Sequence, residues 1–202
     1  NVLPLNIKEE LSICVEMLKK AKKQVKQSLK YLQEMVVCNN YTGLQEGENQ
    51  GFFNMIAKVI NQQMKTKRKF KTYPKKFHVI RTYDAEVMLS GTLNALASNL
   101  MKMSNDIQHL SKTQNNESQS EDSSIFEEHH LIQCEAMSMV CAQVMGNHTT
   151  ISISASQANN LFKPVIAYNL LQSIRLLSDI IVSFNDTCEI DDEVQSDVSI
   201  ET

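Results

Sequence analysis

The chain has 202 residues, a formal net charge of −3 and an ordinary share of apolar residues, 42%. Its length suits one domain with a continuous core, and its charge excludes a global attraction to nucleic acid or to an anionic membrane. Glycine and proline are scarce, which favours long helices, and no apolar run is long enough to span a bilayer. The five cysteines include no C-x-x-C pair, which indicates buried, reduced thiols and an intracellular location.

Residues 7–36 have the spacing of an amphipathic helix. Apolar side chains recur every three or four residues, with Ser28 as the one break in the series. The opposite face carries six lysines: Lys19, Lys20, Lys22, Lys23, Lys26 and Lys30. We interpret this face as solvated, and a docking surface for an acidic partner is the alternative.

A shorter helix is expected over residues 52–60, after a loop rich in asparagine and glycine at residues 39–50. Residues 65–78 then combine seven basic side chains with interleaved aromatic residues. Such a mixture can bind nucleic acid. Pro74 and the slightly acidic balance of the whole chain favour a surface connection between helices instead.

The strongest periodicity lies between Asp84 and Leu110. Apolar residues repeat there with four-three spacing, at Leu89, Leu93, Leu96, Leu100, Met103, Ile107 and Leu110. This spacing predicts a helix over residues 84–110 that packs in coiled-coil fashion. The following residues are polar, and we expect a mobile loop from Ser111 to about Leu131.

Two further helices are expected, over residues 132–147 and 162–184, with a break between them at residues 152–160. The first continues the heptad pattern, and the second has its own stripe: Ile166, Leu170, Ile174, Leu177, Ile181 and Phe184. Five helices predict an all-α long-helix bundle over residues 1–188, followed by an acidic disordered tail at residues 189–202. The apolar stripes exceed what one small bundle buries, so we expect self-association.

Several stretches have a distinctive amino-acid sequence. They read SGTLN and LMKMSNDI at residues 90–94 and 100–107, QCEAMSMVCAQVMGNH at residues 133–148, and LFKPVIAYNLLQSIRLL at residues 161–177. They resemble class II fumarases of the fumarase/aspartase superfamily, and weaker matches extend the resemblance over residues 3–184. It covers only the family's central domain. It implies a bundle of long helices that associates as a tetramer, with active sites drawn from three subunits.

The resemblance also implies a site. Fumarases interconvert fumarate and malate in the tricarboxylic acid cycle, and the resemblance implies no cofactor and no metal. Their base is a serine on a mobile loop, and a glutamate orients a partner histidine. Ser123 matches that serine, and Glu135 matches the glutamate. His129 falls at the position of the family lysine that binds the substrate, a small dicarboxylate.

The rest of the signature departs from the family. Asp122 stands at the position of the glycine, and Glu127 and Glu128 follow Phe126 where the family has Met-Pro and its neighbour. Each carboxylate beside a bound dianion would cost about 1–4 kcal/mol. The family's His-Thr-Gln segment would precede Asn1. We therefore expect a pseudoenzyme with impaired or no independent activity.

Two alternatives stay open. The chain could be a working fumarate hydratase subunit completed by an intact partner or by segments outside this chain. It could also be a non-catalytic helical interaction module that uses its lysine-rich face. Metal binding by residues 127–130 is disfavoured, because adjacent residues rarely converge on one ion. We expect a homo-oligomer or a mixed oligomer with an intact fumarase, no nucleic-acid or membrane partner, and a mitochondrial or cytoplasmic location.

Overall fold

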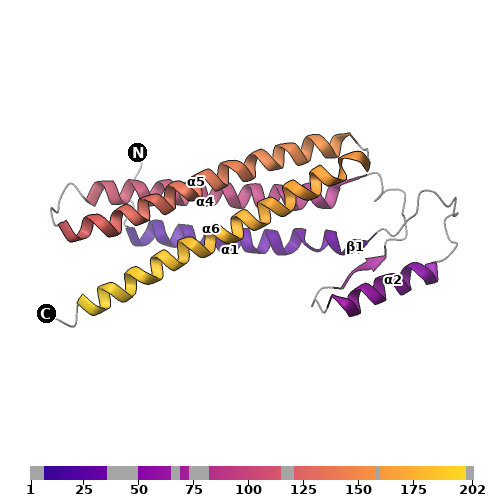
Figure 1. The fold of residues 1–202 in the computed structure, drawn as a ribbon, viewed down its shortest axis with the longest axis horizontal. Helices are drawn as coiled ribbons and strands as arrows, with labels where there is room; N and C mark the ends of the chain where they lie inside the picture. The colour runs from indigo at the N-terminus through magenta and orange to yellow at the C-terminus, as the bar shows by residue number, and fades with distance from the viewer. Residues whose placement is uncertain are drawn as a thin grey trace.

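The computed structural model describes residues 7–35, 50–64, 69–72, 82–114, 121–157 and 160–198. Long helices form an elongated bundle in which neighbours run antiparallel (Figure 1): α1 (Ile7–Ser28), α4 (Asp84–Gln114), α5 (Glu121–Ser156) and α6 (Lys163–Val198). Helix α5 packs against both α4 and α6, and α1 packs on α4. The prediction of an all-α long-helix bundle is confirmed.

A smaller unit lies at one end of the bundle (Figure 1). It contains α2 (Gln50–Gln63) and a parallel pair of short strands, β1 (Glu34–Met35) and β2 (Lys71–Thr72). A 3₁₀ turn, η1 (Tyr31–Gln33), leads from α1 into β1, and a second, η2 (Asn160–Phe162), precedes α6. The sequence did not predict the strands, because two residues are too few to show an alternating pattern.

Buried apolar side chains from α4, α5 and α6 form the core. On α5 the predicted stripe is confirmed, since Cys134, Met137, Cys141 and Val144 are all buried. On α6 the prediction is partly wrong: Ile174 and Ile181 are each 41% exposed, whereas Ser173 and Ile180 are buried. Helix α6 carries apolar residues around much of its circumference, so periodicity alone could not decide which stripe faces the bundle.

The helices extend further than predicted. Helix α4 reaches Gln114 and α5 begins at Glu121, so the expected loop is helical at residues 111–114 and 121–131, and residues 115–120 lie outside the described residues. Helix α6 continues to Val198, so residues 189–198 of the expected tail extend it, and residues 199–202 lie outside the described residues. Low apolar content removes core contacts, but an existing helix still gains one hydrogen bond for each residue it adds.

Helix α5 also continues into the expected break, as far as Ser156, and the break itself begins at Gln157. The hydroxyls of this serine- and threonine-rich stretch bond back to carbonyls one turn earlier. Thr149 donates to Met145, Thr150 to Gly146, and Ser152 to His148, at 2.9–3.2 Å. These bonds keep the hydroxyls within the helix, where they were expected to compete with it.

Ser28, the break in the first apolar stripe, marks the end of α1. Its side chain is 2% exposed, and its hydroxyl donates to the Val25 carbonyl at 2.9 Å. The same oxygen lies 3.1 Å from Thr92 Oγ1 on α4. A buried pair of hydroxyls therefore joins the two helices where the stripe lacks an apolar residue, and α1 is shorter than the predicted helix.

Within the described ranges, one helix is long and apolar enough to cross a membrane by length and composition alone. It spans Lys163–Thr187 of α6, with a mean hydropathy of 1.4. The expectation that no such segment exists was wrong, because it counted uninterrupted apolar runs. In this structure, Ile166, Leu170 and Leu177 of the same segment are buried against the bundle.

Burial raises the pKa of the Cys141 thiol from 9.0 to about 11, and a hydrogen bond with the Met101 backbone opposes part of this change. Between these values the unfolded chain has released the proton and the folded chain still holds it. The free energy of unfolding should therefore fall as the pH rises from 9 to about 11. We expect Cys141→Ala to flatten this dependence in urea denaturation at a series of pH values. An unchanged slope in the variant would contradict this assignment to Cys141.

Candidate functional site

The three residues that the resemblance assigned to a site all lie on α5. Ser123 and His129 belong to the first turns of this helix, and Glu135 follows in the same unbroken element. The side-chain positions of Ser123 and His129 lie outside what the structure describes. Glu135 is described, and its side chain is exposed.

The helical path of α5 separates these residues along one axis. Ser123 and Glu135 are twelve positions apart, which corresponds to about 18 Å along a helix. His129 lies midway, about 9 Å from either along the axis. Within one chain the three residues are therefore spread along the helix axis and do not converge on one point.

The two residues that precede Glu135 are held by neighbouring helices. The Cys134 carbonyl accepts a hydrogen bond from the buried Ser104 hydroxyl of α4 at 2.6 Å. On the other side of α5, Ser183 of α6 donates to Gln133 Oε1 at 3.1 Å. These contacts hold Cys134 against α4 and Gln133 against α6. The Glu135 side chain is exposed.

A buried polar cluster between α5 and α6 was not predicted. Its centre is Asn147, which is 2% exposed. The Asn147 amide donates to Gln172 Oε1 at 3.0 Å and to Ser173 Oγ at 3.1 Å, and its oxygen accepts from Gln143 Nε2 at 2.9 Å. Ser173 in turn donates to the Asn169 carbonyl at 2.8 Å. We call Gln143, Asn147, Gln172 and Ser173 the amide cluster.

A second polar contact joins α5 to α4 one residue further along. Ser90 Oγ lies 2.9 Å from His148 Nδ1, and Ser90 is buried. Both this pair and the amide cluster draw on stretches that carry the family resemblance, residues 90–94, 133–148 and 161–177. Those stretches therefore supply contacts between helices. The sequence alone did not reveal this structural role.

Three surface grooves in the described part of the chain lie away from Glu135. One runs along α1, a second between α1 and α4 beside Gly91 and Thr92, and a third between α2 and β2. Among the described residues, no group of three or more histidine, cysteine, aspartate or glutamate side chains is arranged to hold a metal ion. Glu135, the one described residue of the three, therefore lines none of these three grooves.

Comparisons with known proteins agree on one family. Residues 1–146 match the sequence profile of a family described as lyase. A class II fumarate hydratase from Bacillus cereus is 38% identical over 96% of this chain, and one from Helicobacter pylori is 40% identical over 92%. The crystal structure of a class II fumarase from Schistosoma mansoni superposes with a TM-score of 0.77 at 31% identity, over 92% of this chain.

These relatives are much longer than the chain. The matches cover 44%, 42% and 44% of the three proteins, respectively. The chain therefore spans less than half of their length. Over that part, the similarity to class II fumarases and the long-helix fold expected from it are both confirmed.

Proposed function

The chain belongs to the lyase family, and from that membership we propose that it is a fumarate hydratase-like chain that keeps the oligomerising helical core and does not hydrate fumarate by itself. The observation that carries the second half of this proposal is the composition of the first turns of α5. Asp122 stands at the glycine of the family signature, Glu127 and Glu128 stand at its proline and the next position, and His129 stands at its lysine.

The charge of this segment opposes the family's chemistry. A signature that binds fumarate must offer positive charge to a dianion, because the reaction passes through an intermediate with still more negative charge. Each added carboxylate near the substrate disfavours binding by about 1–4 kcal/mol, depending on the local dielectric. Loss of the lysine removes an attraction of similar size. Together these changes correspond to several powers of ten in rate.

The backbone supports the same proposal. The family's serine lies on a loop that closes over the substrate, whereas residues 121–131 here belong to α5. If Ser123 and Glu135 retain the roles of base and orienting glutamate, about 18 Å of helix separates them within one chain. Their cooperation would require residues from different copies, as the resemblance implies for the family.

The partner that this proposal implies is another fumarase-like chain. Large apolar side chains are exposed on α5, η2 and α6, most of all Leu161, Met139, Tyr168, Leu171 and Ile153, at 61–79%. Exposed apolar area of this extent supports association with a second helical surface. We propose a homo-oligomer, tetrameric by resemblance, or a mixed oligomer with an intact fumarase. The mixed oligomer would make the chain a working subunit, which is the second candidate function.

We also propose an intracellular location, mitochondrial or cytoplasmic. Cys134 and Cys141 form no disulfide and are fully buried in the core. A reducing compartment suits such thiols, and both locations suit a fumarase-like protein.

The pure chain is expected to give no measurable loss of fumarate absorbance, for the electrostatic and backbone reasons above. The same assay should then be run on a mixture with a full-length class II fumarase whose own loop serine has been changed to alanine. The controls are that inactive fumarase alone and a mixture made with Ser123→Ala. Turnover by the pure chain that disappears in Ser123→Ala would refute the proposal. Activity in the mixture alone, dependent on Ser123, would establish the mixed oligomer.

A further inference from the structure

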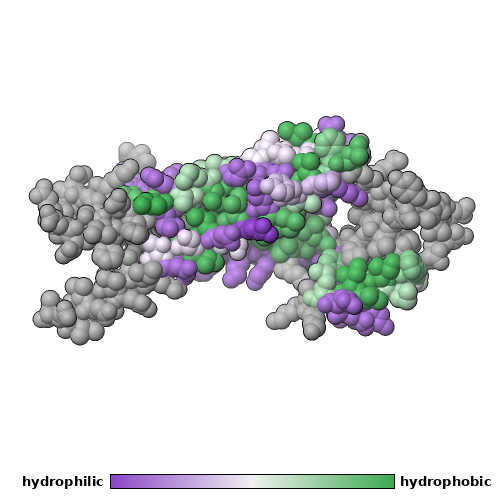
Figure 2. All heavy atoms as spheres, in the orientation of Figure 1, coloured by the Kyte–Doolittle hydropathy of each residue, from purple (hydrophilic) through white to green (hydrophobic). Residues whose placement is uncertain are grey.

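Helix α2 exposes an apolar stripe at the end of the bundle. Phe52, Met55 and Val59 follow the spacing of one helical face and are 53%, 55% and 47% exposed. Figure 2 shows these apolar side chains gathered over α2, beside polar ones on the adjacent face of the same unit. The opposite side of α2 carries buried Ala57 and half-buried Asn61, which face β2. The stripe thus points away from β2, against which α2 packs.

The segment that carries this stripe is strongly basic, although Glu34 of β1 pairs with Lys71 of β2 in the same unit. Residues 49–83 contain nine basic side chains and no acidic one, in a chain whose net charge is −3. The nine are Lys58, Lys65, Lys67, Arg68, Lys69, Lys71, Lys75, Lys76 and Arg81. The expectation that the chain has no attraction to anionic surfaces rested on its net charge, which conceals this local excess.

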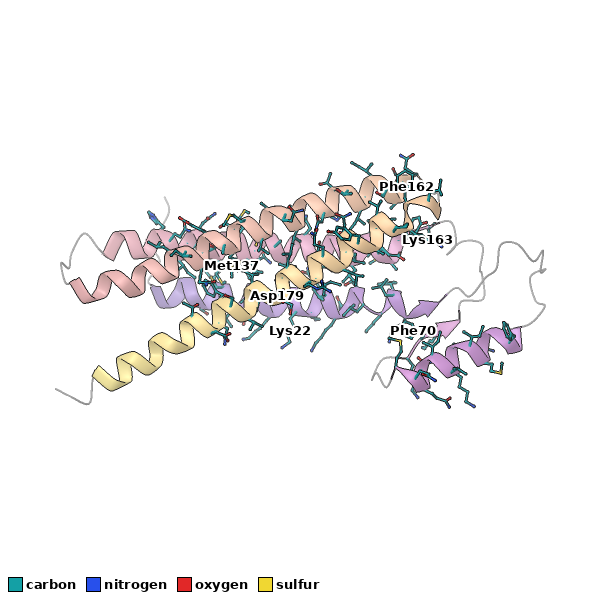
Figure 3. All side chains as sticks on the ribbon, in the orientation of Figure 1. Lys22, Phe70, Met137, Phe162, Lys163 and Asp179 are labelled. Carbon is teal, nitrogen blue, oxygen red and sulfur yellow. The ribbon has the colours of Figure 1, made fainter. Side chains whose placement is uncertain are left out.

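The described lysines are fixed beside α2 by a pair of hydrogen bonds. The Asn61 amide donates to the Phe70 carbonyl at 2.9 Å, and its oxygen accepts from the Phe70 N–H at 2.7 Å. Phe70 is therefore held at α2 (Figure 3), and Lys69 and Lys71 on either side of it are exposed. Together with Lys58 of α2, they line a groove of about 640 Å³.

We propose that the unit formed by α2 and β2 is a docking surface for an anionic phospholipid membrane. Helix α2 would lie in the plane of the bilayer surface with its apolar stripe among the acyl chains. Lys58, Lys69 and Lys71 would contact the phosphate and carboxylate groups of the lipid headgroups. An apolar stripe beside clustered lysines is the combination that interfacial helices use.

Other occupants use only half of this surface. A nucleic acid would satisfy the lysines, but its phosphates gain nothing from Met55 and Val59. A second copy of the chain would cover the apolar stripe, but it would bring two all-basic segments together, and like charges repel across an interface. An anionic bilayer is complementary to the stripe and to the lysines at once.

The test is cosedimentation of the full 202-residue chain with vesicles. Phosphatidylcholine vesicles that contain phosphatidylserine should bind the chain, binding should weaken as salt is raised, and pure phosphatidylcholine vesicles should bind it poorly. Each lysine at an anionic surface contributes about a fivefold increase in affinity. Lys58→Glu, Lys69→Glu and Lys71→Glu combined should therefore weaken binding by about 100-fold or more. Met55→Ser with Val59→Ser should weaken it by about tenfold or more.

The matched control is Lys22→Glu, Lys23→Glu and Lys26→Glu on α1, which makes the same change in net charge on exposed lysines outside the unit. The control should change binding less than about fivefold. Equal losses in the two triple variants would show that net charge alone acts, and would overturn the proposal. Absence of binding to phosphatidylserine vesicles would also overturn the proposal, and so would unchanged binding by Met55→Ser with Val59→Ser.

Tighter binding to a duplex oligonucleotide that is insensitive to the apolar pair would identify a nucleic-acid surface instead. Circular dichroism of each variant checks that the helices are retained, and Lys-to-Gln versions repeat the test with a milder change.

Discussion

A chain carrying Asn147→Leu is expected to unfold about 8 °C below the unchanged chain. The change removes the centre of the amide cluster, which is buried between α5 and α6. Gln143 then loses a partner for its amide, and the Gln172 oxygen and the Ser173 hydroxyl lose the donor they share. Gln143 is exposed, so water can replace that partner. The half-buried Gln172 oxygen and the buried Ser173 hydroxyl each lose a donor at a cost of about 1–3 kcal/mol, so a total near 3 kcal/mol is expected. In a chain of this size each kcal/mol shifts the melting temperature by about 2–4 °C.

The matched control is Asn169→Ala, since the Asn169 amide bonds only to the Val165 carbonyl in an exposed position. It should shift the melting temperature by about 2 °C or less. Adding Ser173→Ala to Asn147→Leu should recover only a small part of the loss, because the Ser173 hydroxyl loses one donor but still donates to the Asn169 carbonyl. Thermal unfolding followed by circular dichroism at one fixed protein concentration measures all three. An Asn147→Leu chain as stable as the control would show that the amide cluster adds no stability.

The amide cluster also shows where sequence reasoning stopped. Periodicity found the apolar residues of the core on α4 and α5, because Leu89, Leu100 and Met137 recur at heptad positions and are buried. It could not find Asn147, since a polar residue on an apolar stripe looks like an interruption until its partners on another helix are known. Ser28 was read as a break for the same reason, and its partner Thr92 lies 64 positions away in the sequence.

Sequence reasoning about the site met a different obstacle. The resemblance placed Ser123, His129 and Glu135 by their order in the chain. Because the family's serine lies on a loop, it also led us to expect a loop around Ser123. Polar composition agreed with a loop, although residues rich in glutamate propagate a helix well once it has begun. The path of α5 through this segment depends on the docking of its later turns against α4 and α6, which no local pattern in residues 121–131 contains.

A second large effect is expected from charging the exposed face of α6. Tyr168 and Leu171 lie one turn apart and are 65% and 64% exposed. If this face is buried between copies of the chain, each side chain contributes about 1.5–3 kcal/mol to association. Tyr168→Ser with Leu171→Lys should therefore raise the dissociation constant by about 100-fold or more, and burying the new lysine would add to that. Light scattering should report an oligomer for the unchanged chain at micromolar concentration and a smaller species for the variant.

The comparison needs an equally disruptive change on a face that the proposal leaves in water. Ile13→Ser with Val15→Lys on α1 serves, because both residues are 44–49% exposed and lie beside the lysine-rich face. This control should keep the oligomer, since one lysine more among Lys19, Lys20 and Lys23 changes little there. Dissociation by both pairs would mean that any loss of exposed apolar area disperses the chain, which is the behaviour of a nonspecific aggregate. Dissociation by the α1 pair alone would place the interface on α1, and a monomer in the unchanged chain would remove the basis for a homo-oligomer. Only selective dissociation by the α6 pair supports an interface built on the side of α6 that faces away from its own bundle.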